Sequence, residues 1–100
     1  AGTIEQLREQ HGDANTLFLS AGDNIGASLF ASSVQQDEPT IDVLNALDLA
    51  ASAVGNHEFD AGFADLTGRV AARAEFPYLG ANVYDATSGD PVMDEYALVE

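Results

Sequence analysis

The sequence predicts an α/β fold in which short helices alternate with the strands of a mostly parallel sheet. Three apolar runs, at 17–19, 50–54 and 78–83, are bounded by turn-forming residues and are typical of strands. Segments with apolar residues at helical spacing separate these runs. The alternation favours right-handed β-α-β connections, and 100 residues suffice for at most one domain with a modest core.

The first helix is expected between a capping-box pattern at Thr3 to Gln6 and a glycine stop at Gly12. The run from Leu17 to Leu19 then predicts a strand buried on both faces, as in a parallel sheet that helices cover on both sides. This strand leads into Gly22 and Asp23. The first predicted strand therefore ends beside a carboxylate.

A polar loop at 35–39 precedes the second helix, for which Thr40 is the predicted cap. Val43, Leu44 and Leu47 lie at three- and four-residue spacing, and we expect them to form the buried face of this helix. The second strand follows the helix, and it too ends in glycine and polar residues.

A third helix is predicted from about Phe63 to Ala74, with an ion pair between Asp65 and Arg69 one turn apart. Residues 78–83 follow as the third strand, and residues 96–99 read as a fourth.

The charge balance of the chain is strongly acidic. Seventeen acidic residues stand against three arginines and no lysine, which gives a formal net charge of −14. Because nucleic acid binding needs Lys and Arg beside the phosphates, we expect no nucleic acid partner. The same charge argues against anionic membrane surfaces, and no apolar run is long enough for membrane insertion. Adaptation to a salty medium and an acidic secreted enzyme both explain such a composition.

Asp23 and the hexapeptide Gly55-Asn56-His57-Glu58-Phe59-Asp60 are candidates for chemistry, because each follows a predicted strand. The carboxyl ends of parallel strands face one edge of the sheet, where open α/β folds bind ligands. The chain has no cysteine, so any metal ion must be held by Asp, Glu, Asn or His. Each residue alone is more often ordinary turn chemistry, but their shared placement favours a site.

His57 is the candidate catalytic residue of the hexapeptide. Asp60 lies three residues further on and is expected to hold one ring nitrogen, which leaves the other nitrogen aimed at a substrate. Glu58 is interpreted as a cap for backbone amides, and Phe59 as a core residue.

These motifs resemble those of the calcineurin-like metallophosphoesterases, and specifically their 5′-nucleotidase branch. Gly22-Asp23, the hexapeptide and the run at 76–83 carry the resemblance, which covers nearly the whole chain. It implies part of a metallophosphoesterase sandwich. It also implies a metal-dependent phosphoric ester hydrolase, similar to a 5′-nucleotidase or a 2′,3′-cyclic phosphodiesterase, that acts on nucleotides or other phosphate esters.

The resemblance also implies residue roles. Asp23 would bridge two divalent metal ions, such as zinc or manganese, and Asn56 would bind one of them. His57, steadied by Asp60, would stabilise the phosphoryl oxygens or the leaving group while a metal-activated water attacks. The family suggests an extracellular, periplasmic or cell-surface location. It implies no substrate-binding residue on this chain and no oligomeric state.

The chain departs from the family pattern at its start. Members open with an Asp-x-His-Gly segment, so residues 1–100 are expected to be a fragment of a single domain that lacks this segment and the C-terminal half. Glu9 to Gly12 imitates the motif, but His11 is expected to be a solvated residue at a helix end. With Asp23 and Asn56 as its credible ligands, the isolated chain is expected to be inactive.

Two other interpretations stay open. One is a non-catalytic acidic α/β module that binds calcium or cationic partners, although the chain has no EF-hand spacing of Asp residues. The other is an ordinary α/β domain in which the Gly-Asn-His turn is accidental.

Overall fold

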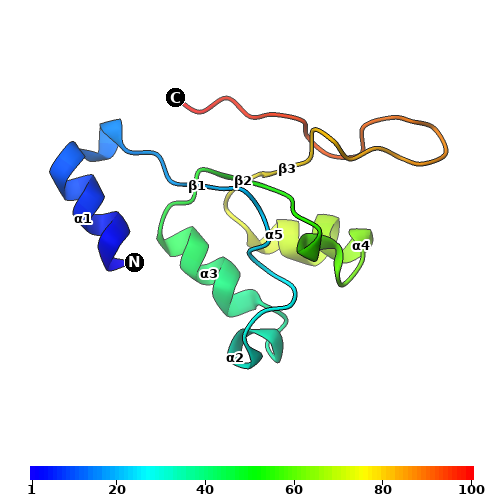
Figure 1. Ribbon diagram of the computed structural model, residues 1–100, viewed down its shortest axis with the longest axis horizontal. Coiled ribbons are helices and arrows are strands. Elements are labelled where there is room, and N and C mark those ends of the chain that lie inside the picture. The colour runs from blue at the N-terminus through cyan, green and yellow to red at the C-terminus, as the bar shows by residue number, and fades with distance from the viewer.

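Three short strands form one parallel sheet at the centre of the molecule (Figure 1). The computed structural model describes all residues from 1 to 100. The strands are β1 (Leu19–Ser20), β2 (Ala51–Ala53) and β3 (Tyr78–Leu79), in the order β1-β2-β3. Ser20 pairs with Ser52, and Ser52 pairs with Tyr78, so all three strands run in the same direction. The α/β fold with a parallel sheet is confirmed.

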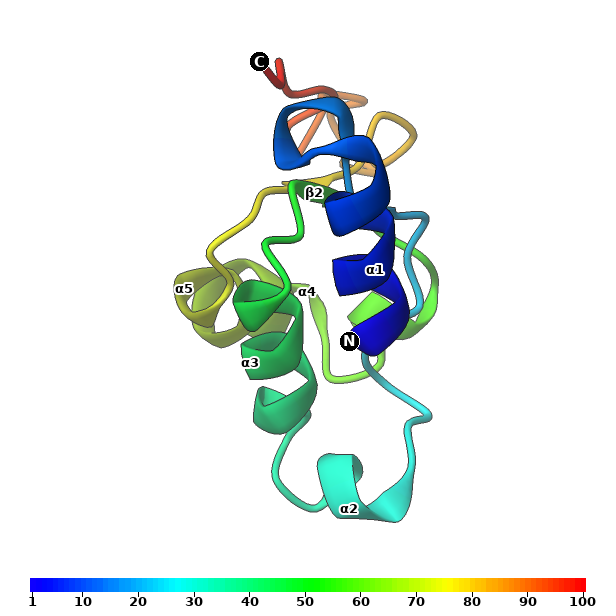
Figure 2. The same cartoon turned by 90° about the vertical axis from the view of Figure 1, so that its left-hand side faces the viewer.

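Helices and helical turns connect the strands. They are α1 (Gly2–His11), η1 (Asp13–Asn15), α2 (Phe30–Ser33), α3 (Glu38–Ala46), η2 (His57–Phe59), α4 (Phe63–Asp65), η3 (Leu66–Val70) and α5 (Ala71–Arg73). In Figure 1, α3 and the α4 to α5 run lie below the sheet, and the C-terminal segment passes above it. Helix α1 stands to one side of the other elements in Figure 1 and faces the viewer in Figure 2. None of these helices is long and apolar enough to cross a membrane.

Helix α1 begins earlier than the capping-box pattern predicts. Its N-cap is Ala1 without any side-chain cap hydrogen bond, and the Glu5 amide donates to the carbonyl of Ala1 at 3.1 Å. Thr3 therefore lies inside the helix, and the predicted cap is wrong. The predicted stop is confirmed, because Gly12 has φ 84° and its amide donates to the carbonyl of Arg8 at 2.7 Å.

Helix α3 also begins before its predicted cap. Asp37 is the N-cap, in the left-handed region at φ 60°, and Thr40 lies inside the helix. Pro39 explains the shift, since proline suits the first helical positions, where an amide donor has no partner. The predicted apolar face is wrong in part, because Ile41 is fully buried whereas Val43 is 54% exposed.

Strand β1 is buried on one face only, which corrects the prediction of two buried faces. Phe18 is half-buried and packs against the core, whereas Leu17 and Leu19 are each 53% exposed. The physical reason is visible in Figure 1, where helices cover one side of the sheet. Alternate residues of the strand therefore point into the core and away from it.

The third predicted helix is one helical run that contains a π-helical turn, η3. Leu66 and Val70 from this turn are buried in the core. The predicted pair between Asp65 and Arg69 is confirmed as two hydrogen bonds of 2.9 Å each.

The last two strand predictions are wrong in extent. Strand β3 comprises two residues where 78–83 is predicted, and residues 96–99 form no strand. Residues 96–99 form no strand because no strand of the sheet lies beside them to provide backbone hydrogen bonds, and Tyr96 and Leu98 are exposed. The C-terminal segment is hydrogen-bonded to the chain after β3 at Asp94, whose carbonyl accepts from the amide of Gly80 at 2.8 Å.

The hydrophobic core lies between the sheet and the helices beneath it. It is modest, as predicted, since 12 of 100 residues are buried. Its buried cluster comprises Ile25, Ile41, Leu49, Leu66, Val70, Phe76 and Tyr78. This cluster draws on every connection between the strands, so it fixes where the loops leave the sheet.

Candidate functional site

The ends of β1 and β2 bring the two predicted ligand residues to one edge of the sheet. The two strands pair in parallel, with Ser20 opposite Ser52, and both chains leave the sheet in the same direction. Asp23 follows β1 by three residues, and Asn56 follows β2 by three residues. Both are exposed.

The loops after the two strands are in direct backbone contact. A Cβ on Gly22 would lie 2.5 Å from the amide nitrogen of Gly55, and a Cβ on Gly55 would overlap the Asp23 carboxylate. Only glycine at both positions permits this approach. The Asp23 Oδ1 atom also accepts a hydrogen bond of 3.1 Å from the amide of His57. Asp23 itself has φ 55°, a left-handed conformation that Asp tolerates better than most residues.

Glu58 holds these two loops together from inside. Its side chain is 2% exposed, and its carboxylate accepts hydrogen bonds from three backbone amides. The donors are Asp23 at 2.9 Å, Asn24 at 2.8 Å and Gly55 at 2.6 Å. The sequence interpretation of Glu58 as a cap for backbone amides is confirmed, but it did not foresee that the amides belong to both loops.

Asn24 is a residue of the site that the sequence reasoning missed. Its side-chain amide donates to the hydroxyl of Ser52 at 2.8 Å, and its carbonyl oxygen accepts from the hydroxyl of Ser20 at 2.7 Å. Asn24 therefore links the ends of β1 and β2 through one side chain. Ser20 and Ser52, which lie opposite each other in the sheet, could have indicated this role of Asn24. Recognising them as a pair requires the strand register, which the sequence does not provide.

His57 and Asp60 form the predicted pair on the turn η2. The Nδ1 atom of His57 lies 2.8 Å from Oδ2 of Asp60, and both side chains are partly exposed. The hydrogen bond and the charge of Asp60 raise the pKa of His57, with smaller contributions of the same sign from Asp23 and Glu58. Because a carboxylate only accepts hydrogen bonds, the proton sits on Nδ1 when the ring is neutral. The Nε2 atom then remains available to another group.

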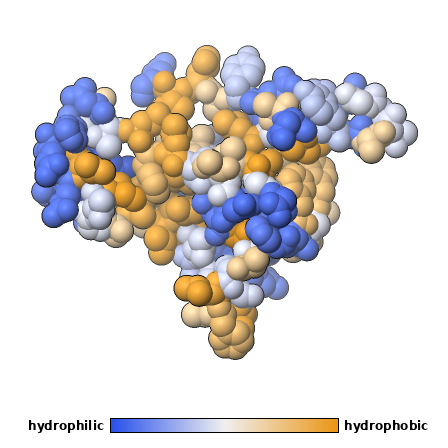
Figure 3. All heavy atoms as spheres, in the orientation of Figure 1, coloured by the Kyte–Doolittle hydropathy of each residue, from blue (hydrophilic) through white to orange (hydrophobic).

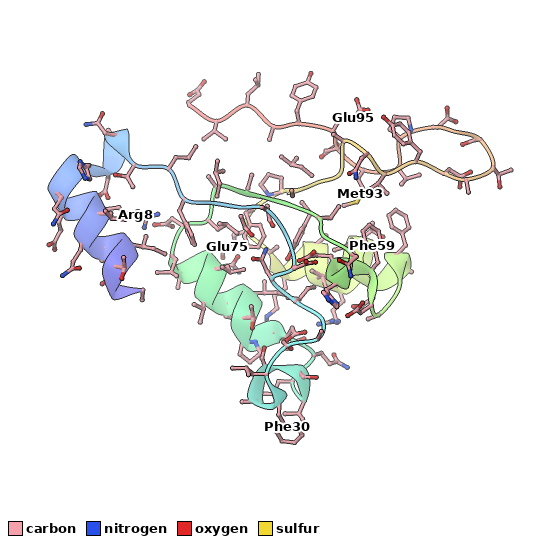
Figure 4. All side chains as sticks on the ribbon, viewed as in Figure 1. Arg8, Phe30, Phe59, Glu75, Met93 and Glu95 are labelled. Carbon is pink, nitrogen blue, oxygen red and sulfur yellow. The ribbon has the colours of Figure 1, made fainter.

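Phe59 lies at the margin of the core. Its ring stacks on Phe63 with centroids 6.4 Å apart, and it packs against the buried cluster while remaining half-buried. Figure 4 shows Phe59 beside the start of α4. The predicted packing role is confirmed, and it anchors the η2 turn that carries His57.

A cavity of about 360 Å³ opens beside the His57 and Asp60 pair. Ile25 lines it from the first loop, and Asp65 and Arg69 line it from the helical run. Arg69 is engaged in its two hydrogen bonds to Asp65 and in a third to the carbonyl of Gln36 at 3.0 Å. The cavity therefore has a polar lining whose one arginine is already paired.

The donors for a metal ion at this edge are the Asp23 carboxylate and the Asn56 amide oxygen. Both are oxygen ligands of the type that hard and borderline divalent cations accept. No group of three or more His, Cys, Asp or Glu side chains lies close enough together to hold an ion alone. His11 lies exposed at the C-terminal end of α1, as the sequence predicted.

Comparison with known proteins identifies relatives of this chain. No protein-family model matches it. A 2′,3′-cyclic-nucleotide 2′-phosphodiesterase/3′-nucleotidase from Yersinia enterocolitica is 35% identical over an alignment of 107 positions, which covers 100% of this chain and 16% of the relative. A 5′-nucleotidase from Vibrio vulnificus is 31% identical over 98 residues, which cover 97% of this chain and 18% of the relative.

A solved structure has the same arrangement of the backbone. NAD nucleotidase from Haemophilus influenzae matches 87% of this chain with a TM-score of 0.65 and 30% sequence identity, over 16% of its own length. The chain thus spans less than a fifth of the length of each of these proteins.

Proposed function

The chain belongs to the 5′-nucleotidase family of the metallophosphoesterases, and we propose that it is part of the catalytic domain of an enzyme that hydrolyses nucleotide phosphate esters. The observation that carries the proposal is the convergence of Asp23, Asn56 and the His57–Asp60 pair at one edge of the sheet. These residues come from two loops more than thirty positions apart in the chain.

Members of this family are metal-dependent, and for this protein we propose two divalent ions, zinc or manganese. Asp23 would bridge the ions and Asn56 would bind one of them, which suits the oxygen donors that both side chains expose. When bound, the metal would supply positive charge for the phosphate and would activate a water molecule as the nucleophile. Two donors leave most of each coordination shell open, so the remaining ligands would come from other parts of the full-length protein.

His57 would act on the phosphate through Nε2. Asp60 holds Nδ1 and so fixes which ring nitrogen faces the substrate. A protonated Nε2 can donate to a phosphoryl oxygen or give a proton to the leaving oxygen. The raised pKa of His57 favours that protonated form.

The extent of the chain supports a segment of a larger enzyme. The relatives are several times longer, so we propose that residues 1–100 are one fragment of a single domain and that this fragment alone does not turn over substrate. We also propose an extracellular, periplasmic or cell-surface location, with nucleotides rather than nucleic acid as substrates. The net charge of −14 supports the second part of this proposal.

The test compares two histidine variants of the full-length protein. Metal is removed with a chelator and manganese is restored, and phosphate release from AMP is measured. His57→Ala is expected to lower kcat by about 10²–10⁴-fold, as for the loss of a general acid or base. His11→Ala removes the other histidine of this chain and is expected to stay within about twofold of wild type.

Asp60→Asn tests the second member of the pair. It is expected to lower kcat by about 10–100-fold, because the ring of His57 loses the carboxylate that orients it. Circular dichroism confirms that each variant is folded. Phosphate release by His57→Ala at the wild-type rate, or by wild type without metal, would contradict the proposal, and cleavage of single-stranded DNA in place of AMP would contradict the substrate class.

A further inference from the structure

The side chain of Glu58 binds backbone amides of both loops that carry the proposed metal ligands. Its carboxylate accepts from the amides of Asp23 and Asn24 after β1 and from the amide of Gly55 after β2. Asp23 and Asn24 precede Glu58 by 35 and 34 residues in the sequence, whereas Gly55 precedes it by three. The bonds therefore connect segments that the chain itself does not hold together.

The position of these amides determines where the ligand side chains point. Asp23 has its own amide bound to Glu58, and its carboxylate accepts from the amide of His57. Asn56 lies between Gly55, whose amide is bound to Glu58, and His57, whose amide is bound to Asp23. Each proposed ligand thus sits next to a backbone bond of this small network.

The burial of Glu58 makes the network costly to rearrange. Glu58 is 2% exposed and forms no ion pair, so the three amides are the partners of its carboxylate. Hydrogen bonds from amides to a buried carboxylate are strong, and each donor left without an acceptor in the interior costs free energy. A glutamine in place of Glu58 has one acceptor oxygen for these three amides and would leave at least one of them without an acceptor.

We propose that Glu58 is a positioning residue that sets the separation of Asp23 and Asn56 and thereby the affinity of the site for divalent metal. This inference rests on the proposed function, in which Asp23 and Asn56 bind metal. Both carboxylate oxygens of Glu58 accept hydrogen bonds from backbone amides, so Glu58 is not itself proposed as a metal ligand.

The chain offers a matched control in Asp37. This carboxylate is also buried, at 8% exposed, and it accepts from the amide of Gly26 at 2.9 Å and from the hydroxyl of Ser32 at 2.8 Å. It contacts neither Asp23 nor residues 55–57. Asp37→Asn therefore removes a comparable buried carboxylate that binds an amide of the loop after β1, at Gly26, but none of the amides that Glu58 binds.

The experiment measures manganese binding to the metal-stripped full-length protein by titration calorimetry. Glu58→Gln has one acceptor oxygen for three amides, and its NH₂ group faces donors. We expect it to weaken manganese binding by about tenfold or more, while Asp37→Asn stays within about twofold at a similar loss of thermal stability. Equal effects of the two variants, or wild-type affinity in Glu58→Gln, would overturn the proposal.

A second variant keeps the test decisive if Glu58→Gln does not fold. Glu58→Asp keeps the charge but is one methylene shorter, so it cannot reach both loops at their present separation. A loss of affinity in this variant supports positioning, and wild-type affinity overturns it. Failure of the wild-type protein to bind manganese would instead reject the proposed function.

Discussion

At the scale of single residues, three carboxylates of this acidic chain have three different environments and roles. Asp23 is exposed at the sheet edge, Glu58 is buried and caps amides of two loops, and Asp37 is buried at the start of α3. The sequence identified Asp23 by its position after a strand. It identified Glu58 as a cap for backbone amides but not its partners on the other loop, which lie 34 and 35 residues away, and it did not single out Asp37.

The hydrogen bonds of Asp37 predict that its contribution to the stability of the fold decreases at acid pH. Burial acts to raise its pKa, but hydrogen bonds from Ser28, Gly26 and Ser32 outweigh burial and hold the pKa below the usual 3.8. The stabilisation is therefore present above the unfolded pKa and is lost as the pH falls through the lower folded value. Asp37→Asn is expected to lower the free energy of unfolding by about 1–2 kcal/mol at pH 7 and by less at pH 2.

Denaturant unfolding at both pH values measures this difference. Asp90→Asn serves as the control, because it removes the same charge from an exposed carboxylate that accepts no side-chain hydrogen bond. A loss in Asp37→Asn that is the same at pH 2 as at pH 7 would contradict the assignment to the ionised carboxylate.

At the scale of elements, the site depends on two loops whose backbones touch. The pattern of apolar residues in the sequence predicted the positions of these loops correctly. Both loops follow predicted strands, and β1 and β2 pair in parallel. The lengths of the strands and the starts of α1 and α3 were predicted less well. Cap patterns are local, whereas the ends of these elements are decided by packing and by the pairing of strands.

We expect alanine substitutions at Gly55 and Gly68 to have different effects on the free energy of unfolding. Gly55→Ala would force the new Cβ into the Asp23 carboxylate, whereas a Cβ at Gly68, in η3, meets nothing within 4 Å. We expect Gly55→Ala to lower the free energy of unfolding by about 1–3 kcal/mol, as overpacking does. Gly68→Ala is expected to be neutral or to stabilise by up to about 1 kcal/mol, because Ala is the better helix former.

Chemical denaturation of the two variants in the full-length protein provides the measurement. Equal stability of Gly55→Ala and Gly68→Ala would show that the loops can separate without cost.

At the scale of the whole molecule, a small core is combined with a large negative charge. The molecule measures 48 × 33 × 19 Å, so it is flat, and large apolar side chains are left exposed. Figure 3 shows an apolar tip at the bottom, at α2, and a hydrophilic lobe at α1. Leu29 and Phe30 are among the exposed apolar residues. Figure 4 shows the Phe30 side chain at this tip, away from the rest of the chain.

The net charge of −14 predicts that salt stabilises the chain. At 0.1 M salt the Debye length is about 10 Å, and at 1 M it is about 3 Å, so added salt screens the repulsion between carboxylates. The surface ion pairs that salt also weakens, such as Arg73 with Asp42 at 2.7 Å, contribute little each. We expect the Tm of the 100-residue chain to rise by roughly 5 °C or more between these concentrations.

Thermal unfolding followed by circular dichroism measures this shift. The effect should shrink at pH 4, where many carboxylates lose their charge. A Tm that falls with salt at pH 7 would mean that the ion pairs outweigh the repulsion.

The sequence by itself determined the α/β class, the family and the four candidate residues Asp23, Asn56, His57 and Asp60. These follow from local order along the chain: strand, turn, and polar residues at fixed spacing. The tertiary structure decided that β1 is covered on one face, that Asn24 joins two strands and that Glu58 holds the two loops together. The physical reason is that these features depend on contacts between residues about thirty positions apart, which only the register of the sheet and the packing of the core bring together.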